Sequence, residues 1–223
     1  MAPLLYLNYI EKIMIKYLYR LVLVLFFTLT FSEDITSYSK LPKIGNNELT
    51  IFWDGKTSIK PELPIQFSDL YKDGPILLSF WFLGCGPCVA EMKHLSKFNK
   101  KYKDTGFKVI SISTDTKSKG KVKSFVKKKK YTFDMLFDRK GKDGVIKKLG
   151  SNSCPFTALI NMDGTIYAKH LGYERGDEVA LEKEINELIE YNKQFNQEEI
   201  DSLKIEEIDS LEVEEIEKNL EVE

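Results

Sequence analysis

Two cysteines separated by two residues are the most chemically suggestive feature of this chain. They are Cys85 and Cys88 in FWFLGCGPCVAEM, with Gly86 and Pro87 between them. A C-x-x-C pair can form half of a zinc site, but that use requires a second such pair or two suitably spaced histidines. The other common use is thiol–disulfide exchange, in which a thiolate attacks a disulfide. The chain has only three cysteines and two histidines, and the histidines lie far apart, so its composition favours redox chemistry.

Such a pair needs a strand that ends before it and a helix that begins at it. ILLSFWF (76–82) is a continuous apolar run, typical of a strand buried on both faces. From Gly86 onward the apolar residues follow the spacing of one helix face. At the start of that helix, Cys85 faces unpaired backbone N–H groups and the positive end of the dipole, which stabilise its thiolate. Cys88 follows one turn later, where it can resolve a mixed disulfide, and Pro87 costs little in a first turn. A purely structural disulfide across so short a loop would stabilise little.

The rest of the chain predicts an α/β fold with a mixed sheet. Asp54-Gly55 and Asp163-Gly164 mark the turns of two hairpins. The order is a hairpin, then β-α-β-α-β-α, two strands and a final helix, which predicts helices on both faces of the sheet. The predicted ranges are 48–59 for the first hairpin, 76–82, 107–113 and 132–138 for strands, 119–130 and 145–149 for helices, 156–172 for the second hairpin and 181–189 for the apolar stripe of the last helix.

The net charge of −1 conceals two regions of opposite sign. Residues 198–223 hold twelve acidic and two basic side chains, a charge of −10, and the remaining 197 residues carry 31 basic and 22 acidic ones, a charge of +9. The acidic region repeats with a period of eight, which fits neither a heptad nor an eleven-residue repeat. We therefore expect residues 197–223 to be a solvated acidic tail, disordered or partly helical. The lysines of residues 117–130 lack the arginines and interleaved aromatics of a nucleic-acid reader, so we interpret them as a solvated helix face. A lid formed by the acidic tail over these lysines is the alternative.

The N-terminal residues carry the pattern of a secretory signal. Two basic residues, an apolar run over 21–27 and then small residues follow the order of such a segment, for which Met14 would be a more usual start than Met1. We expect residues 1–32 to be a signal peptide, with an uncleaved membrane anchor over residues 13–31 as the alternative. Residues 33–196 would then form the folded domain. Both alternatives place that domain outside the cytoplasm, where disulfides persist.

The stretch SFWFLGCGPCVAEM resembles the active-site motif of the thioredoxin fold, and within it that of the extracytoplasmic TlpA/ResA-type thiol–disulfide oxidoreductases. The likeness continues through FKVISISTD, YTFDMLFD and CPFTALINMDGTIYAKHLGY and covers about residues 41–192. It implies a thioredoxin-like fold with a mixed central sheet, flanking helices and an N-terminal β-hairpin. The tryptophan that precedes the first cysteine in that family is Gly84 here, which removes an apolar wall beside Cys85. The buried carboxylate of thioredoxin corresponds to Ser79, which cannot accept a proton in that role.

The resemblance also assigns supporting residues around the pair. Pro155 would be a cis-proline against the active disulfide, and Cys154 before it would lend its backbone to an incoming substrate strand. Three interpretations of the Cys154 thiol stay open: a small side chain that fits the space, a redox partner of Cys85 or tuner of its potential, or a ligand in a three-thiolate metal site. Glu91 matches a glutamate of the family and is either a tuner of the pair or a first-turn residue favoured by the helix dipole.

We expect this chain to be an extracytoplasmic thiol–disulfide oxidoreductase whose Cys85–Cys88 pair carries two electrons. The resemblance implies a reductant of protein disulfides, as in cytochrome c maturation, with protein thiols or disulfides as substrates and an upstream electron donor. Neither an organic cofactor nor a nucleic-acid partner is expected. The alternative function is binding of copper or zinc by Cys85, Cys88 and Cys154. Of the histidines, we expect His94 to be solvated and His170 to be structural.

Overall fold

The structure is a computed structural model that describes residues 14, 18, 39–45 and 48–220, with side chains described up to Gln197 and at Lys204. The chain divides into two units, Met1–Ser37 and Tyr38–Glu223. The predicted signal peptide or anchor lies almost wholly outside the described residues. Within the part of the chain that is described, no helix is both long enough and apolar enough to cross a membrane.

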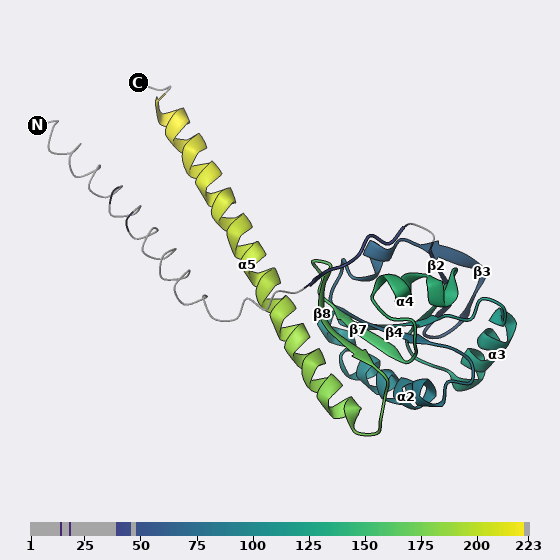
Figure 1. Cartoon of the computed structure of the whole chain (residues 1–223). Helices are drawn as coiled ribbons and strands as arrows, with labels where there is room; N and C mark the ends of the chain where they lie inside the picture. The colour runs from purple at the N-terminus through teal and green to yellow at the C-terminus, as the bar shows by residue number, and fades with distance from the viewer. Residues whose placement is uncertain (1–13, 15–17, 19–38, 46–47, 221–223) are drawn as a thin grey trace, which may run out of the picture. The chain divides into compact units, whose positions relative to one another are not determined.

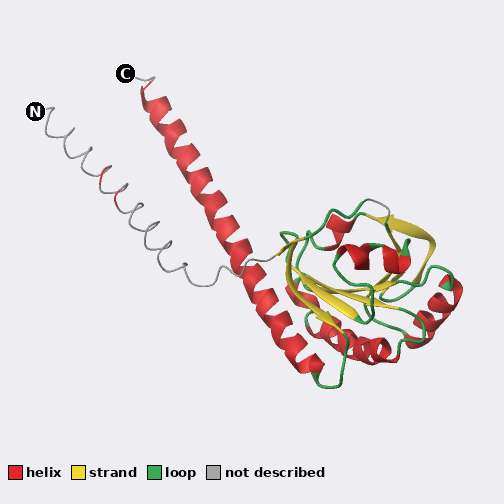
Figure 2. Cartoon of the chain, viewed as in Figure 1, coloured by secondary structure: helices red, strands yellow, loops and turns green. Residues whose placement is uncertain are grey.

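One mixed sheet of eight strands organises the second unit (Figures 1 and 2). Its strands are β1 (Ser39–Lys40), β2 (Leu49–Asp54), β3 (Ser58–Ile65), β4 (Ile76–Trp81), β5 (Lys108–Ser113), β6 (Asp134–Asp138), β7 (Phe156–Ile160) and β8 (Thr165–Leu171). They lie in the order β1-β8-β7-β4-β5-β6-β2-β3. The central strand β4 is parallel to β5 and antiparallel to β7, and β5 is parallel to β6. The two predicted hairpins, β2–β3 and β7–β8, are confirmed as antiparallel pairs.

The helices cover the two faces of the sheet unequally. They are α2 (Gly86–Lys101), α3 (Lys119–Lys129), α4 (Val145–Lys148) and α5 (Asp177–Leu220). Along β4, Leu77 belongs to one buried cluster and its neighbours Ile76 and Leu78 to another, and this alternation places the clusters on opposite faces. The first cluster holds the buried side chains of α2, α3 and α5, whereas the second is closed by α4 and the 3-10 segment Phe67–Leu70. Helices therefore lie on both faces, as predicted.

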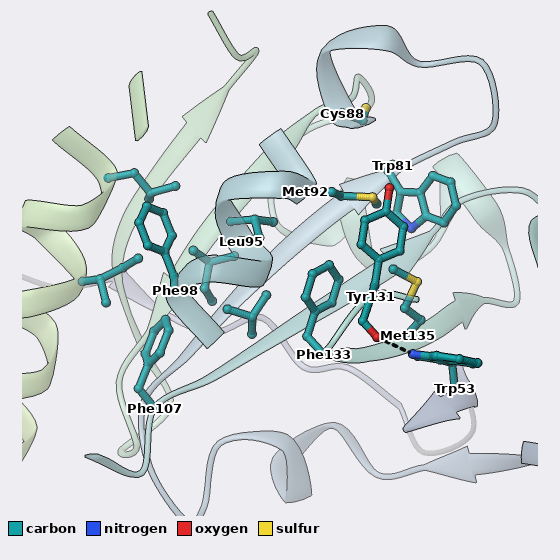
Figure 3. Close-up of a cluster of buried hydrophobic side chains, with 14 of the residues drawn as sticks. Trp53, Trp81, Cys88, Met92, Leu95, Phe98, Phe107, Tyr131, Phe133 and Met135 are labelled. Atoms are coloured by element: carbon teal, nitrogen blue, oxygen red, sulfur yellow. Dashed lines mark hydrogen bonds between the residues drawn. The ribbon is translucent and has the colours of Figure 1, made fainter. Parts of the chain in front are cut away.

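The larger of these two clusters fixes the position of α2. Met92 and Leu95 point from α2 into a group of aromatic side chains that includes Trp81 and Phe133, and all four are at most 2% exposed (Figure 3). Cys88 is drawn at the edge of the same group and is fully buried. Because interiors are close-packed, this contact holds the first turn of α2 in a defined place at the end of β4.

The last helix is much longer than the apolar stripe predicts. Its first half buries Leu181, Ile185, Leu188 and Ile189. It then continues to Leu220 without interruption, so that the boundary expected at residue 197 falls inside a helix. Residues 197–220, which we expected to be disordered or partly helical, are therefore helical in the structure.

The sheet edges carry the features that the sequence pattern did not predict. Strand β1 has only two residues, too few for an alternation to be visible. Strand β3 extends to Ile65 through Pro61 and Pro64, and the Lys60–Pro61 bond is cis. These prolines lie on an edge strand, where a missing N–H removes no bond of the sheet interior.

Candidate active site

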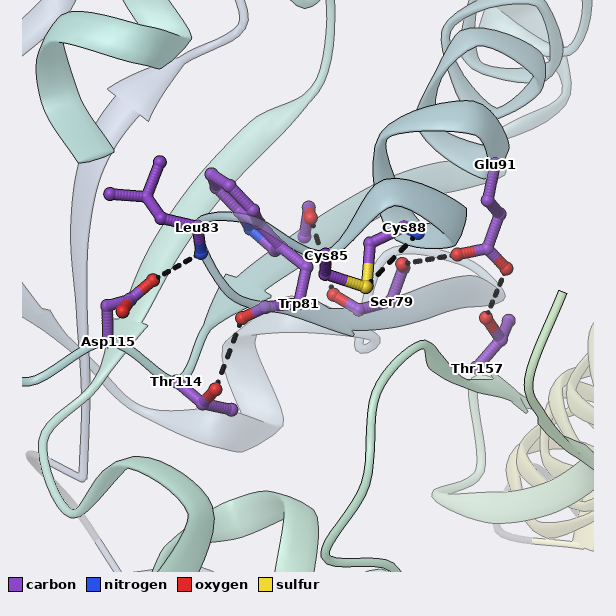
Figure 4. The surroundings of a disulfide bond; sticks show 10 residues. Ser79, Trp81, Leu83, Cys85, Cys88, Glu91, Thr114, Asp115 and Thr157 are labelled. Carbon is purple, nitrogen blue, oxygen red and sulfur yellow. Dashed lines mark hydrogen bonds between the residues drawn. A yellow bond between two sulfur atoms is a disulfide. The ribbon is translucent and has the colours of Figure 1, made fainter. Parts of the chain in front are cut away.

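The paired cysteines lie where β4 ends and α2 begins (Figure 4). Cys85 and Cys88 form a disulfide, with Cα atoms 5.3 Å apart. Cys85 is the N-cap residue of α2, and its sulfur accepts a hydrogen bond of 3.2 Å from the backbone N–H of Cys88. Pro87 occupies the first turn, as predicted. Cys85 is 5% exposed and Cys88 is 0% exposed, so Cys85 is the sulfur that an incoming group can reach.

Gly84 gives the loop before Cys85 its shape. Its φ of +89° lies in the region that favours glycine. A Cβ atom added there would meet no atom within 4 Å, so the space beside the loop is open. The apolar wall that the resemblance would place at this point is absent, yet Cys85 is still nearly covered by the rest of the site.

A buried carboxyl group follows Cys88 by three residues, and it belongs to α2 rather than to a strand. Glu91 is 3% exposed and accepts hydrogen bonds from the hydroxyl groups of Thr157 at 2.7 Å and Ser79 at 3.1 Å (Figure 4). Burial raises the pKa of Glu91, and these two hydrogen bonds oppose the rise. The interpretation of Glu91 as a first-turn residue stabilised by the dipole is wrong, because the side chain turns inward from the second turn. Since Glu91 follows Cys88 by three residues, both lie on the same face of α2.

The Cys154–Pro155 bond is cis, as the resemblance implies. Cys154 is a free cysteine that packs against both buried clusters. Burial raises the pKa of its thiol to about 11, although a hydrogen bond with Thr114 opposes the rise. A thiol with that pKa is almost entirely protonated at neutral pH, so Cys154 is a poor nucleophile in this setting.

A hollow of about 450 Å³ borders the disulfide motif. Pro87 forms one side of it, and the Cys154–Pro155 pair forms another. Leu171, the last residue of β8, and Gly172 after it form a third side, and the backbone N–H of Gly172 donates to the carbonyl of Pro155 at 2.8 Å. Leu171 is 67% exposed, so the rim of the hollow is apolar at this point.

Both histidines face glutamates of α5. His94 Nε2 lies 3.8 Å from a carboxylate oxygen of Glu178, and the His94 side chain is 27% exposed. His94 is therefore half-buried rather than fully solvated, because α5 partly covers it. His170 Nε2 lies 2.6 Å from Glu184 Oε2 and thus links β8 to α5.

Among the described residues, no group of three His, Cys, Asp or Glu side chains is arranged to hold a metal ion. In the oxidised pair, moreover, the sulfurs of Cys85 and Cys88 are bonded to each other rather than free as thiolates.

Three polar residues of the site were not singled out from the sequence. They are Thr114, Asp115 and Thr157, which form hydrogen bonds with Trp81, Leu83 and Glu91, respectively, and which lie on or directly after strands that pair with β4. Thr157 pairs directly with Ser79 across β7 and β4. The sequence signal for Thr157 is a hydroxyl in the otherwise apolar strand β7, because a buried hydroxyl needs a hydrogen-bond partner. The sequence does not show which residue of another element that partner is.

Comparison with known proteins gives one matching family. The model of the redoxin family matches residues 54–188. Among curated proteins, the thiol-disulfide oxidoreductase ResA of Halalkalibacterium halodurans is 33% identical over 108 residues, which are 48% of this chain and 59% of that protein. ResA of Oceanobacillus iheyensis is 31% identical over 102 residues, which are 46% of this chain and 51% of that protein. The match therefore spans little more than half the length of these relatives.

Solved structures of similar sequence share the fold. A protein of Chlorobium tepidum assigned as the thiol:disulfide interchange protein DsbE has a TM-score of 0.55 and 27% identity, covering 68% of this chain and 99% of that one. A thiol:disulfide interchange protein from Bacteroides sp. has a TM-score of 0.52 and 26% identity, covering 67% of this chain and 90% of that one.

Proposed function

The chain belongs to the redoxin family, and from that premise we propose that it is a thiol–disulfide oxidoreductase that works through Cys85 and Cys88. One observation carries the proposal: the disulfide caps the N-terminus of α2, and Glu91, whose carboxyl group is buried, follows Cys88 by three residues on the same helix. Such a position combines a stabilised thiolate with a nearby proton acceptor.

In the reducing direction, the exchange begins at Cys85. Its thiolate attacks one sulfur of a substrate disulfide, forms a mixed disulfide and releases the other substrate sulfur as a thiolate. The N-cap position stabilises the Cys85 thiolate through the backbone N–H of Cys88 and the helix dipole. The hollow beside Pro87 and the Cys154–Pro155 pair is where the substrate segment would lie.

Cys88 completes the reaction. It loses its proton and attacks Cys85, which re-forms the Cys85–Cys88 disulfide and releases the second substrate thiolate, so that two electrons pass to the substrate. Cys88 is fully buried, and water therefore has little access to its proton. We assign Glu91 as the acceptor of that proton. Because burial raises its pKa, the Glu91 carboxylate takes up a proton near neutral pH more readily than an exposed glutamate does. Oxidation of a substrate dithiol follows the same steps in reverse.

The finer function follows from the resemblance and the N-terminal pattern. We propose that the protein acts outside the cytoplasm. Residues 1–32 would direct its export as a signal peptide, or residues 13–31 would hold it at the membrane as an anchor. Its substrates would be protein disulfides, such as that of a C-x-x-C-H haem-attachment site, and a membrane-side donor would reduce it again. The disulfide pair itself serves as the redox group, and no organic cofactor is needed.

Thiol counting across glutathione buffers tests the main proposal. The full chain is equilibrated at a series of glutathione to glutathione-disulfide ratios, alkylated and weighed. We expect a reversible two-electron transition in which Cys85 and Cys88 change together and Cys154 stays a thiol throughout. A Cys88→Ser variant should accumulate a mixed disulfide at Cys85, whereas Cys85→Ser should not.

Metal analysis of the same preparation covers the alternative function. If the three thiols resist oxidation while zinc or copper remains bound in stoichiometric amount, the oxidoreductase proposal is wrong and the metal-binding one replaces it.

For the proposed role in cytochrome c maturation, exchange with an oxidised C-x-x-C-H peptide should be faster than with a peptide in which the histidine is alanine. Equal rates would remove the support for a role in cytochrome c maturation.

A further inference from the structure

The loop that presents Cys85 donates a hydrogen bond to a residue outside its own chain segment. The backbone N–H of Leu83 donates to the Oδ2 atom of Asp115 at 2.7 Å (Figure 4). Asp115 follows the end of β5, and its carboxylate is also 3.5 Å from the hydroxyl of Ser113. Leu83 lies two residues before Cys85, so this bond acts at the point where the chain turns from β4 into the disulfide motif.

The neighbouring residues of the loop are weakly held by packing. Gly84 has no side chain and open space beside it, and Phe82 is 42% exposed. Within the loop, the backbone N–H of Cys85 donates to the carbonyl of Phe82 at 3.2 Å, which closes a turn without tying it to the rest of the domain. Leu83 between them packs against the first buried cluster, and the hydrogen bond from its N–H to Asp115 is a second attachment of the loop to the domain.

Thr114 is attached to the end of β4 and lies beside Cys154. Its backbone N–H and its hydroxyl both donate to the carbonyl of Trp81, at 2.9 and 3.2 Å. Thr114 also lines the same hollow as Cys154, the residue before the cis-proline. The residues that follow β5 thus hold the end of β4 and lie beside Cys154.

A polar residue between a strand and a helix often serves as a helix cap, but Asp115 does not. Helix α3 has Ser118 as its N-cap, and no side chain caps it there. The hydrogen bonds of the Asp115 carboxylate go to Leu83 and Ser113 instead.

We propose that Asp115 is a positioning residue of the reaction: its carboxylate, acting through the Leu83 N–H and together with Thr114, holds the disulfide loop in the orientation that presents Cys85 to substrate. The proposal rests on the proposed function for its catalytic consequence. Its structural part, the attachment of Leu83 to Asp115, can be read without any catalysis.

Two substitutions separate positioning from mere folding. Asp115→Asn keeps a carbonyl oxygen that can accept the Leu83 N–H, whereas Asp115→Ala removes the acceptor. In the full chain, we expect the alanine variant to exchange with glutathione disulfide about tenfold more slowly, because small displacements of a reacting group lower rates steeply. The asparagine variant should stay within about twofold of the wild type.

Hydrogen exchange of the Leu83 amide supplies the second readout. It should become about tenfold or more faster in Asp115→Ala and remain near the wild-type rate in Asp115→Asn. Asp54→Ala is the matched control, because Asp54 accepts the backbone N–H groups of Lys56 and Thr57 in the remote β2–β3 turn. We expect that variant to lose thermal stability with no change in exchange at Leu83 or in the rate of Cys85.

Three outcomes decide the matter. Normal rates and normal Leu83 protection in Asp115→Ala would overturn the proposal, as would an asparagine variant as slow as the alanine one. If the wild type itself does not exchange with any disulfide, the proposed function fails, and Leu83 protection alone then decides whether Asp115 holds the loop.

Discussion

At the scale of single residues, the site depends on groups that are paired out of reach of water. Glu91 is held by two hydroxyls on adjacent strands, and both sulfurs of the disulfide are nearly or fully covered. Ser79, which cannot itself accept a proton in the place of the thioredoxin carboxylate, donates a hydrogen bond to the carboxylate of Glu91. The buried carboxyl group of this site therefore stands on the helix rather than on the strand.

The buried charge of Glu91 makes a pH-dependent prediction for stability. Its pKa in the folded protein is above 4.5, the usual value, because burial disfavours the carboxylate. The folded state therefore binds the proton more tightly than the unfolded state, and stability falls as pH rises through the folded pKa. We expect Glu91→Gln to raise the free energy of unfolding at pH 7, by about 1.4 kcal/mol for each unit of pKa elevation, and so to raise the melting temperature, whereas below pH ~4 both should be unchanged.

Glu48→Gln is the control of opposite sign. A hydrogen bond from Lys148 is the main cause that lowers the pKa of Glu48, so its stabilisation is present at neutral pH and lost in acid. We expect Glu48→Gln to have a lower melting temperature than the wild type at pH 7.

Glu91 should also affect the rate of the reaction. Glu91→Gln should slow release of the mixed disulfide about tenfold at pH 7. A pH–rate profile identical to that of the wild type would exclude Glu91 as the proton acceptor.

At the scale of elements, the site is assembled from the ends of neighbouring strands. β4 leads into α2, β5 is followed by Thr114 and Asp115, and β7 begins directly after the cis-proline.

The face of the sheet opposite α2 is closed by short segments, and one of them, α4, is anchored by a single carboxylate. The buried Asp138 accepts backbone N–H bonds from Lys140 at 3.0 Å and Val145 at 2.5 Å, which anchors the start of α4.

Gly144 is the residue at which this anchor should be most sensitive. A methyl group there would overlap the Asp138 carboxylate, which cannot move without giving up the bond to Val145. We expect Gly144→Ala to lower the free energy of unfolding by about 2–3 kcal/mol, measured by urea denaturation. Gly120→Ala is the control: nothing lies within 4 Å of its added Cβ, and it should stabilise α3 by about 0.5–1 kcal/mol. Equal effects of the two substitutions would contradict the assignment of Asp138 as an anchor.

At the scale of the whole molecule, the sheet domain and the acidic half of α5 differ in kind. Along the described part of α5, the last fully buried side chain is Asn192, whose amide bonds to Asn161 and Leu188. The twelve acidic residues all follow that position. Their removal should change the charge of the protein without opening its core.

A chain that ends at Gln197 tests this separation. Removal of residues 198–223 takes away a charge of −10 and leaves a remainder of +9. We expect the melting temperature to change by no more than about 2 °C and the midpoint of the glutathione titration to stay the same, while the isoelectric point becomes strongly basic. Loss of cooperative unfolding in the shortened chain would show that the second half of α5 packs on the domain after all.

The sequence by itself determined the elements and the reacting pair. Continuous apolar runs, two Asp-Gly turns and the helical spacing after Gly86 are local signals, so the strand, the helix and the C-x-x-C pair between them could be identified without coordinates. The cis-proline was reached through resemblance alone. The two-residue β1 and the uninterrupted length of α5 were not predicted, because the first is too short to show a pattern and the acidic repeats lack a helical period.

Only the tertiary structure decided what surrounds the pair. Glu91 meets Thr157 and Asp115 meets Leu83 because the order and register of the strands bring them together across 66 and 32 positions of the chain. Burial, which sets the pKa of Glu91 and of the Cys154 thiol, is likewise a sum over neighbours that come from several elements. Spacing along the chain identifies the group that can react, whereas its reactivity depends on contacts that exist only after the sheet has formed.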